Sequence, residues 1–507
     1  MSIQEDFIQE LQARYSYQHD KIILGKAKLE NEVLQETEIA LALKTLNRHG
    51  LIAGATGTGK TKTLQLITEQ LSKKGIPTLV MDLKGDLSGI GAKGEVTASI
   101  EERHTLLNLP FVPKAYPVEL LSISTELGVE LKATVEEFGP IYFSKILELN
   151  DTQESIITII FKYCVDKKLP LVNLQDIRSV LQYVTESKIG KSELNSAYGT
   201  IAPASLGAIL RKIVALEQQG ASKFFGEPSF EAKDLLHQKD GEGVVNIIRL
   251  VDIQSYPNLF STFMLSLLHK IYTQLPEVGD VDQPKLVIFI DEAHLIFKEA
   301  TKSLLNQIET IVKLIRSKGV GLVFVTQVPS DIPDFILGQL GFKVQHALRG
   351  FTAKDRKQIQ KAVENYPITK YYSADEVITQ LGIGEAFVTA LDEKGIPTPL
   401  VYTYLHSPSS RMDVLTPEEI ATIVQRSALV KKYNQQIEKA SARSIIQQKQ
   451  QEELSVPQPK NTPKQQTSVP TKDWTDDKMV RDISRTATRK LIDWGMKLLV
   501  NAIKGKK

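Results

Sequence analysis

The stretch "HGLIAGATGTGKTKTL", His49–Leu64, decides the fold. Residues 54–61, "GATGTGKT", match the pattern Gly-x-x-x-x-Gly-Lys-Ser/Thr, which is the P-loop. The apolar run "GLIAG" at 50–54 predicts a short strand before the loop, and "TKTLQLITEQLSKKG" at 61–75 predicts a helix after it. A Gly-rich loop between a strand and a helix is the context in which this motif holds phosphate groups.

The residue types of the motif suit a phosphate chain. Glycines let backbone N–H groups turn inward around phosphates, and the helix N-terminus adds the positive end of its dipole. We expect Lys60 to reach the β and γ phosphates of ATP and the Thr61 hydroxyl to ligate Mg²⁺. The alternative is a Gly-rich turn that binds nothing. The predicted nucleotide contacts are Gly54, Ala55, Thr56, Gly57, Thr58, Gly59, Lys60, Thr61 and Lys62.

Strands and helices alternate on both sides of this motif. Strands are predicted at 76–82, 116–123, 243–252, 285–294, 320–327 and 342–351. Such alternation predicts an α/β fold with a mostly parallel, doubly wound sheet, here a RecA-like P-loop core. "GEAFVTALDEKGIPTPLVYTYL" at 384–405 is typical of a hairpin with its turn at "DEKG".

The sequence divides into seven predicted segments. An N-terminal helix and a small strand pair are expected at 1–45, and an α-helical insertion at 131–240 separates two parts of the core. Helical spacing with a capping box at Thr416 and Glu419 predicts one long helix near 411–446. A Gln- and Pro-rich linker and a C-terminal helical tail follow. The segments are 1–45, 46–130, 131–240, 241–410, 411–446, 447–474 and 475–507.

A second motif supplies the carboxylates that a P-loop needs. The apolar run "LVIFI" ends in Asp291 and Glu292. We predict that Asp291 anchors Mg²⁺ and that Glu292 polarises a water for in-line attack on the γ phosphate. The alternative is a strand that ends in two solvated charges. A water-activating glutamate favours a motor-type ATPase over a small-molecule kinase, which excludes water.

Three further side chains fit a hydrolytic site. Gln327 ends the strand "GLVFVTQ" and is expected to sense the γ phosphate or the water, or else to cap a buried strand. We expect Arg316 and Arg349 near the same sheet edge, where either would stabilise transition-state charge in its own or a neighbouring subunit's site, or would be an ordinary surface or ion-paired arginine. Asp82 is expected to bind the attacking water or to stabilise a turn.

Histidines and cysteine add little chemistry. His294 follows the Asp-Glu pair, and we expect it to pack or to support that pair; it is the only histidine that we place near the chemistry. The single cysteine, Cys164, excludes a disulfide framework and is predicted to be buried. The N-terminus lacks the pattern of a secretory signal, so we expect a cytoplasmic protein.

The net charge limits the kinds of partner that the protein is expected to bind. The net charge of +2 argues against a broad basic surface but permits a few basic loops in a channel. The tail at 475–507 predicts a helix with one apolar face and one basic face. Such a helix contacts an anionic membrane, a partner or nucleic acid, or docks back on its own protein.

Four motifs in order resemble a known family. "NRHGLIAGATGTGKTKTL", "DLKGDLSG", "KLVIFIDEAHLIF" and "VGLVFVTQVPSDIPDFILGQLG" are together similar to the HerA/FtsK group of P-loop ATPases, and within it to the bacterial YjgR-like, or HerA-like helicase, branch. The resemblance covers residues 20–425. It implies a RecA-like core, Mg²⁺-dependent ATP hydrolysis, a hexameric ring, DNA in the central channel and an arginine finger from the next subunit. Because few residues precede the P-loop in this sequence, we expect no counterpart of the N-terminal β-barrel of HerA and doubt a HerA-type nuclease partnership.

Two functional hypotheses follow. The first is an ATP-hydrolysing ring motor that translocates or remodels DNA. The second is an ATP-dependent scaffold that its basic C-terminal helix recruits to a membrane or a partner.

Overall fold

The computed structural model describes residues 2–253, 256–298, 302–435, 437 and 440–455. The chain divides into one unit over Met1–Gln450 and a second over Gln451–Lys507. The predicted helix at 475–507 and the part of the predicted linker after Ser455 lie outside the described residues.

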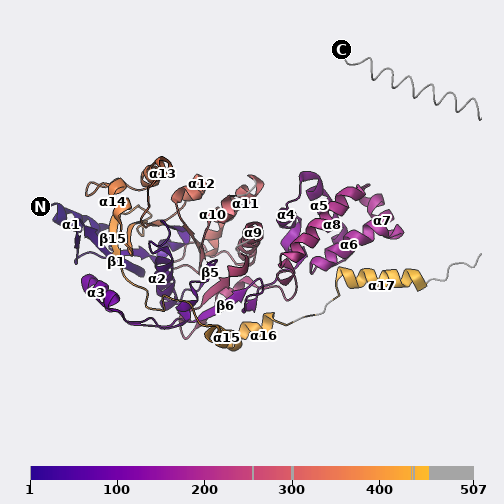
Figure 1. Ribbon diagram of the computed structural model, residues 1–507, viewed down its shortest axis with the longest axis horizontal. Coiled ribbons are helices and arrows are strands. Elements are labelled where there is room, and N and C mark those ends of the chain that lie inside the picture. The colour runs from indigo at the N-terminus through magenta and orange to yellow at the C-terminus, as the bar shows by residue number, and fades with distance from the viewer. Residues whose placement is uncertain (1, 254–255, 299–301, 436, 438–439, 456–507) are drawn as a thin grey trace, which may run out of the picture. The chain divides into compact units, whose positions relative to one another are not determined.

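A large sheet forms the centre of the first unit (Figure 1). Its strand order is β2-β1-β15-β14-β13-β4-β12-β11-β5-β10-β6-β7, and β3 pairs with β1. The strands are β1 (Lys21–Leu29), β2 (Glu32–Val33), β3 (Ile39–Ala42), β4 (Gly50–Ala53), β5 (Thr78–Asp82), β6 (Val118–Ser122), β7 (Val129–Glu130), β10 (Val245–Arg249), β11 (Leu286–Ile290), β12 (Val320–Thr326), β13 (Phe342–Gln345), β14 (Glu385–Ala390) and β15 (Val401–Leu405).

The part of the sheet from β13 to β7 is parallel, which confirms the predicted fold class. Strand β4 lies between β13 and β12, and β11 lies between β12 and β5. The carboxyl ends of these strands therefore meet at one edge, where ligands bind in such folds. The predicted hairpin is β14 and β15, which pair antiparallel.

Helices cover both faces of the sheet, so its central strands are apolar throughout. In β11, Ile288 contributes to the core on one face with residues of α9 (Pro257–Gln274), whereas Phe289 contributes to the core on the other face with residues of α2 (Lys60–Lys73). The remaining helices of the core are α1 (Ile3–Arg14), α3 (Ala98–Leu107), α10 (His294–Phe297), α11 (Lys302–Ile315), α12 (Asp334–Leu337), α13 (Ala353–Glu364) and α14 (Ala374–Gln380).

The small strand pair predicted near the N-terminus is present as β1 and β2. Strand β1 pairs with the short β2, but it also pairs with β3 and with β15, and so joins the main sheet. Gly25 lies opposite Leu405 in this antiparallel pairing. An added Cβ at Gly25 would lie 2.0 Å from the Tyr404 carbonyl oxygen, so only glycine allows the two strands to approach this closely.

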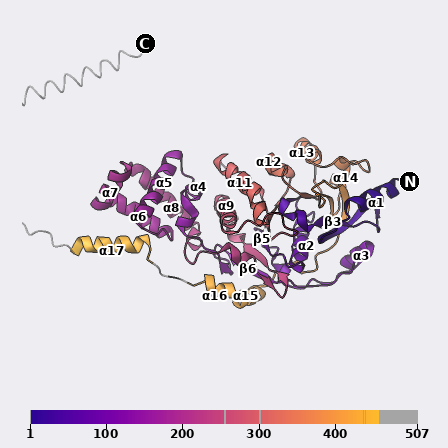
Figure 2. The same ribbon diagram turned by 180° about the vertical axis from the view of Figure 1, so that it is seen from behind.

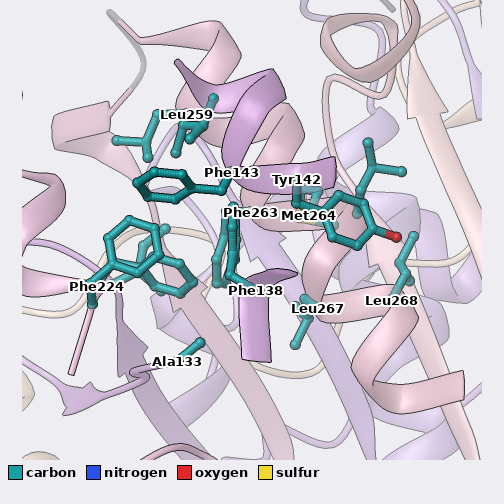
Figure 3. Packing of buried hydrophobic residues seen from close by; sticks show 14 of the residues in the cluster. Ala133, Phe138, Tyr142, Phe143, Phe224, Leu259, Phe263, Met264, Leu267 and Leu268 are labelled. Carbon is teal, nitrogen blue, oxygen red and sulfur yellow. The ribbon is translucent and has the colours of Figure 1, made fainter. Parts of the chain in front are cut away.

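The predicted α-helical insertion contains α4 (Val135–Ile146), α5 (Asp151–Asp166), α6 (Leu174–Glu186), α7 (Lys188–Tyr198) and α8 (Pro203–Gln218). These helices group together in both views of the chain (Figures 1 and 2). Aromatic rings pack the insertion against α9 (Figure 3). The ring centroids of Phe138 and Phe224 are 5.6 Å apart, and those of Phe224 and Phe263 are 5.2 Å apart. The insertion is therefore attached to the core by side-chain packing on α9, in addition to the two chain segments that connect it to the core.

No single helix in the described ranges is long and apolar enough to cross a membrane. Helices α7 and α8 reach that length and apolar character only when taken together, and the chain bends by 110° between them.

The predicted long helix after the core is broken. Helix α15 (Pro417–Arg426) ends at Ser427, whose extended backbone and side chain cap the next helix, α16 (Ala428–Tyr433). Helix α17 (Ala442–Ser455) runs through residues predicted to begin the linker at 447. Its first turn is fixed on the insertion, because the Ala442 amide donates to Pro170 O at 2.9 Å and Ile446 joins the insertion's core.

Candidate active site

The P-loop connects β4 to α2 at the carboxyl edge of the sheet. Both neighbouring strands hold its start: the Gly54 amide donates to Gln327 O at 3.2 Å, and the Ala55 amide donates to Ala347 O at 2.8 Å. Thr56 and Gly57 are exposed at the tip of the loop, and Gly57 has φ of +78°, which favours glycine. The loop is thus fixed at its base and open at the tip.

Lys60 lies folded into the loop that it is predicted to serve. Its ammonium is buried and donates to Gly54 O at 2.7 Å and to Ala55 O at 3.0 Å. Burial lowers the pKa of Lys60, the charge of Lys84 lowers it further, and Glu292 and Asp291 oppose both. The two carboxylates therefore lie within electrostatic reach of the P-loop lysine, as the predicted pairing of the two motifs requires.

Asp291 follows the last residue of β11 directly and is almost wholly buried. Its Oδ1 accepts from the Glu292 amide at 2.9 Å, whereas its Oδ2 has no hydrogen-bond partner in the described part of the chain. Burial raises the pKa of Asp291 to about 7, although the charge of Lys84 opposes this. A buried carboxylate oxygen without a donor is costly, and a cation ligand would satisfy it.

Those features test whether Mg²⁺ fits. Carboxylate, hydroxyl and phosphate oxygens are the ligands that Mg²⁺ prefers. The free Oδ2 of Asp291 and the partly exposed Thr61 at the first turn of α2 provide the first two at the same edge of the sheet. The residues present therefore fit a Mg²⁺ ion.

Glu292 adopts an unusual backbone conformation. Its φ of +47° lies in the left-handed region, which is rare for a residue with a long side chain. Such backbone strain persists where the surrounding structure over-determines it, and it concentrates at functional sites. The side chain is only 10% exposed, and its Oε2 lies 3.3 Å from His294 Nδ1 without a directed hydrogen bond.

Lys84 is a residue of this site that the sequence motifs did not predict. It follows β5, the strand paired with β11 in parallel register, and its Nζ lies 2.5 Å from Glu292 Oε1. Burial lowers the pKa of Lys84, but the hydrogen bond with Glu292 and the charges of Asp291, Glu292 and Asp86 raise it overall. The motif "DLKGDLSG" contains Lys84, but only the strand order shows which carboxylate it meets.

Asp82 and Asp86 belong to the same turn. Asp82 Oδ1 accepts from the amides of Gly85 and Asp86, and its Oδ2 accepts from Leu87. Of the two roles expected for Asp82, the structure shows the stabilisation of a turn. That turn holds Lys84 over the edge of the sheet.

Gln327 lies where its predicted role needs it. It follows β12, the strand between the P-loop strand β4 and the carboxylate strand β11. Its carbonyl accepts from the Gly54 amide, and its side chain is exposed. A change at Gln327 is therefore linked to the P-loop through the main chain.

His346 corrects the expectation that His294 is the only histidine near the chemistry. It follows β13 and is wholly buried beneath the P-loop, where an added Cβ on Gly54 would lie 2.5 Å from its own Cβ. Its Nδ1 lies 3.1 Å from Glu385 O, and its Nε2 lies 2.8 Å from Thr63 Oγ1. The fragment "FKVQH" contains the residue, but its neighbourhood with α2 depends on the sheet order.

Two predicted site residues are differently placed. Arg316 precedes β12, and its charge acts on His49, which precedes β4, so Arg316 lies at the amino edge and not at the edge of the P-loop. It pairs with Asp280 at 3.3 Å. The ammonium of Lys62 donates to Met412 O at 2.6 Å, in the segment after β15, rather than to the loop.

Arg349 does lie at the carboxyl edge, after β13. Its side chain is exposed and donates to Thr379 O at 2.9 Å. Its role as an arginine finger stays a prediction.

The family model described as "Helicase HerA-like C-terminal" matches residues 27–504. The chain belongs to the HerA-like family. The DNA double-strand break repair helicase HerA of Sulfurisphaera tokodaii is 23% identical over 373 residues, which are 72% of this chain and 66% of the relative. HerA of Saccharolobus solfataricus is 23% identical over 380 residues, 72% of this chain and 66% of the relative.

The HerA-like chain thus spans slightly less than two thirds of the length of these curated relatives. Among solved structures, the bacterial conjugative coupling protein TrwBdeltaN70 in complex with sulphate has a TM-score of 0.50 and 14% identity. The match covers 78% of this chain and 95% of that one. The two chains therefore share the α/β fold of the HerA-like core.

Proposed function

We propose that this protein is a Mg²⁺-dependent ATPase that works as a ring motor and translocates or remodels DNA. The observation that carries the proposal is Glu292, a residue with a strained backbone and a buried carboxylate that follows β11 and acts electrostatically on the P-loop lysine. Family membership and the DNA repair helicases among the relatives support DNA as the polymer. The hexameric ring rests on the resemblance to the family.

The residues have distinct tasks in the proposed reaction. Lys60 contacts the β and γ phosphates, and loop amides bind their oxygens. Glu292 accepts a proton from water as the water oxygen attacks the γ phosphorus and the bond to the β–γ bridging oxygen breaks, giving ADP and phosphate. Asp291 and Thr61 would hold Mg²⁺, which neutralises charge on the phosphates when bound. Gln327 contacts the γ phosphate or the water, so cleavage of the γ phosphate changes its position and, through its main chain, that of β12 and the P-loop.

The test is phosphate release by the full chain with Mg²⁺ and ATP at low salt, with and without linear double-stranded DNA. We expect DNA to raise the rate, and Glu292→Gln to bind ATP but lower turnover by about 10²–10⁴-fold, the contribution of a positioned base. Glu309→Gln is the matched control, because within the described residues the ion pair of Glu309 is with its helix neighbour Lys313. Normal turnover by Glu292→Gln would refute the assigned base, and a rate that DNA leaves unchanged would count against the DNA motor.

A native mass measurement with bound nucleotide tests the ring. A hexamer is the expected assembly, and a monomer under all nucleotide conditions would contradict it.

A further inference from the structure

The ion pair between Lys84 and Glu292 is more than a surface contact. In the parallel pairing, Met81 of β5 lies opposite Ile290 of β11. Lys84 and Glu292 follow these two residues, so both lie at the same edge of the sheet. The Nζ–Oε1 distance is 2.5 Å. The lysine side chain is 40% exposed and the glutamate side chain 10% exposed, so an accessible cation meets an enclosed carboxylate.

This pair conflicts with the task of a general base. A general base must bring a carboxylate oxygen into hydrogen-bond contact with the attacking water, and Oε1 is in contact with the Lys84 ammonium instead. The other oxygen, Oε2, lies 3.3 Å from His294 Nδ1. Glu292 is therefore held by a cation through one of its two oxygens.

Lys84 follows β5 at the carboxyl edge of the sheet, the edge at which the P-loop also lies. The charge of Lys84 lowers the pKa of Lys60, the lysine inside the P-loop, and is second only to burial in doing so. Two cations thus face one site that is built for a polyanion. A γ-phosphate carries more charge than one carboxylate, and charge-assisted bonds between an ammonium and phosphate oxygens are strong.

We propose that Lys84 restrains Glu292 in an ion pair until the γ-phosphate of a bound nucleoside triphosphate draws the ammonium away and frees the carboxylate. This inference rests on the proposed ATPase function and adds its regulation. ADP lacks the γ-phosphate, so it leaves the pair closed. Lys84 is then a positioning residue that distinguishes triphosphate from diphosphate and couples this distinction to the base.

The test measures binding, so that it is separate from turnover. Dissociation constants for ADP and for the non-hydrolysable β,γ-imido analogue of ATP are measured with Mg²⁺ on the full chain by calorimetry. Lys84→Ala is expected to raise the dissociation constant of the analogue, relative to that of ADP, by on the order of tenfold, which is the contribution of one charge-assisted hydrogen bond. Lys84→Arg keeps the cation and is expected to retain most of the discrimination.

The matched control is Lys74→Ala. Lys74 is similarly exposed, at 37%, and pairs with Asp20 at 2.7 Å just beyond the far end of α2. Half-exposed ion pairs add little to folding stability, so both alanine variants are expected to stay folded by circular dichroism. Lys74→Ala is expected to leave the ratio of the two dissociation constants unchanged.

A double-mutant cycle separates partner exchange from simple charge repulsion. Glu292→Gln frees the ammonium beforehand, so the analogue should bind more tightly than in the wild type, and Lys84→Ala in the same chain should abolish this gain. If the gain persists in the double variant, or if Lys84→Ala weakens ADP and the analogue equally, the inference is overturned. If the wild type binds neither nucleotide, the proposed ATPase function fails and this inference fails with it.

Discussion

His346 offers a quantitative prediction, because its hydrogen bonds define one protonation state. The Glu385 carbonyl accepts only, so Nδ1 must carry the proton, and Nε2 then accepts from the Thr63 hydroxyl. Burial, and next the charge of Lys60, lowers the pKa of His346 to about 4. We therefore expect the neutral ring to stabilise the fold and its protonation to destabilise it.

The magnitude follows from the contacts. His346→Ala removes two hydrogen bonds worth about 1 kcal/mol each and leaves a cavity worth about 2 kcal/mol, so the loss in free energy of unfolding is about 4 kcal/mol at pH 7.5. Because the folded pKa lies below the ordinary value of 6.5, the wild type keeps this stabilisation above pH 6.5 and loses it as the pH falls toward 4. At about 1.4 kcal/mol per pH unit, the difference between wild type and variant should shrink to about 2 kcal/mol at pH 5.

The assay is urea unfolding at pH 7.5 and pH 5, followed by far-ultraviolet circular dichroism, with midpoints and slopes compared. His19→Ala is the control, since His19 is 43% exposed, and its effect should stay within about 0.5 kcal/mol at both pH values. The reasoning is refuted if His346→Ala costs less than about 1 kcal/mol at pH 7.5, or if its cost is the same at both pH values.

Two other predictions concern a buried carboxylate and the candidate fingers. Glu69 on α2 accepts hydrogen bonds from the amides of Ser409 and Ser410, at 2.7 and 2.9 Å, and from both hydroxyls. Glu69→Ala leaves these donors unpaired and should lower the free energy of unfolding by about 3 kcal/mol; an unshifted urea midpoint would contradict this. Arg349→Ala should lower kcat about 10³-fold with analogue binding retained, as expected of a finger, whereas Arg316→Ala, on the opposite edge, should leave kcat normal. The reverse result in steady-state assays would exchange the two assignments.

The local motifs of the active site were predictable from the sequence because each is written in consecutive residues. The P-loop at 54–61 and the Asp291–Glu292 pair each combine an apolar strand with polar residues at its end. Parallel strands then bring such ends to one edge, so the general position of Gln327 was predictable too.

The contacts between segments were not predictable, because they depend on strand order and register. Lys84 meets Glu292 only because β5 lies beside β11, and His346 lies beneath the P-loop only because β13 lies beside β4. Arg316 was misplaced for a related reason: it lies before a strand rather than after one. The break at Ser427 was missed because helical periodicity continues across it, whereas a serine cap ends one helix and begins the next.

The pairing of β1 with β15 has a consequence for biosynthesis. Ile23 O and His406 Nε2, which lie 2.9 Å apart at this seam, are separated by 383 residues. At about 5–20 residues per second, a ribosome needs about 20–80 s to supply the second partner. During that time β1 exposes an unpaired edge of backbone groups, which invites pairing with another chain. Nascent chains of this protein should therefore depend on chaperones that cover their N-terminal strand until translation has passed the hairpin.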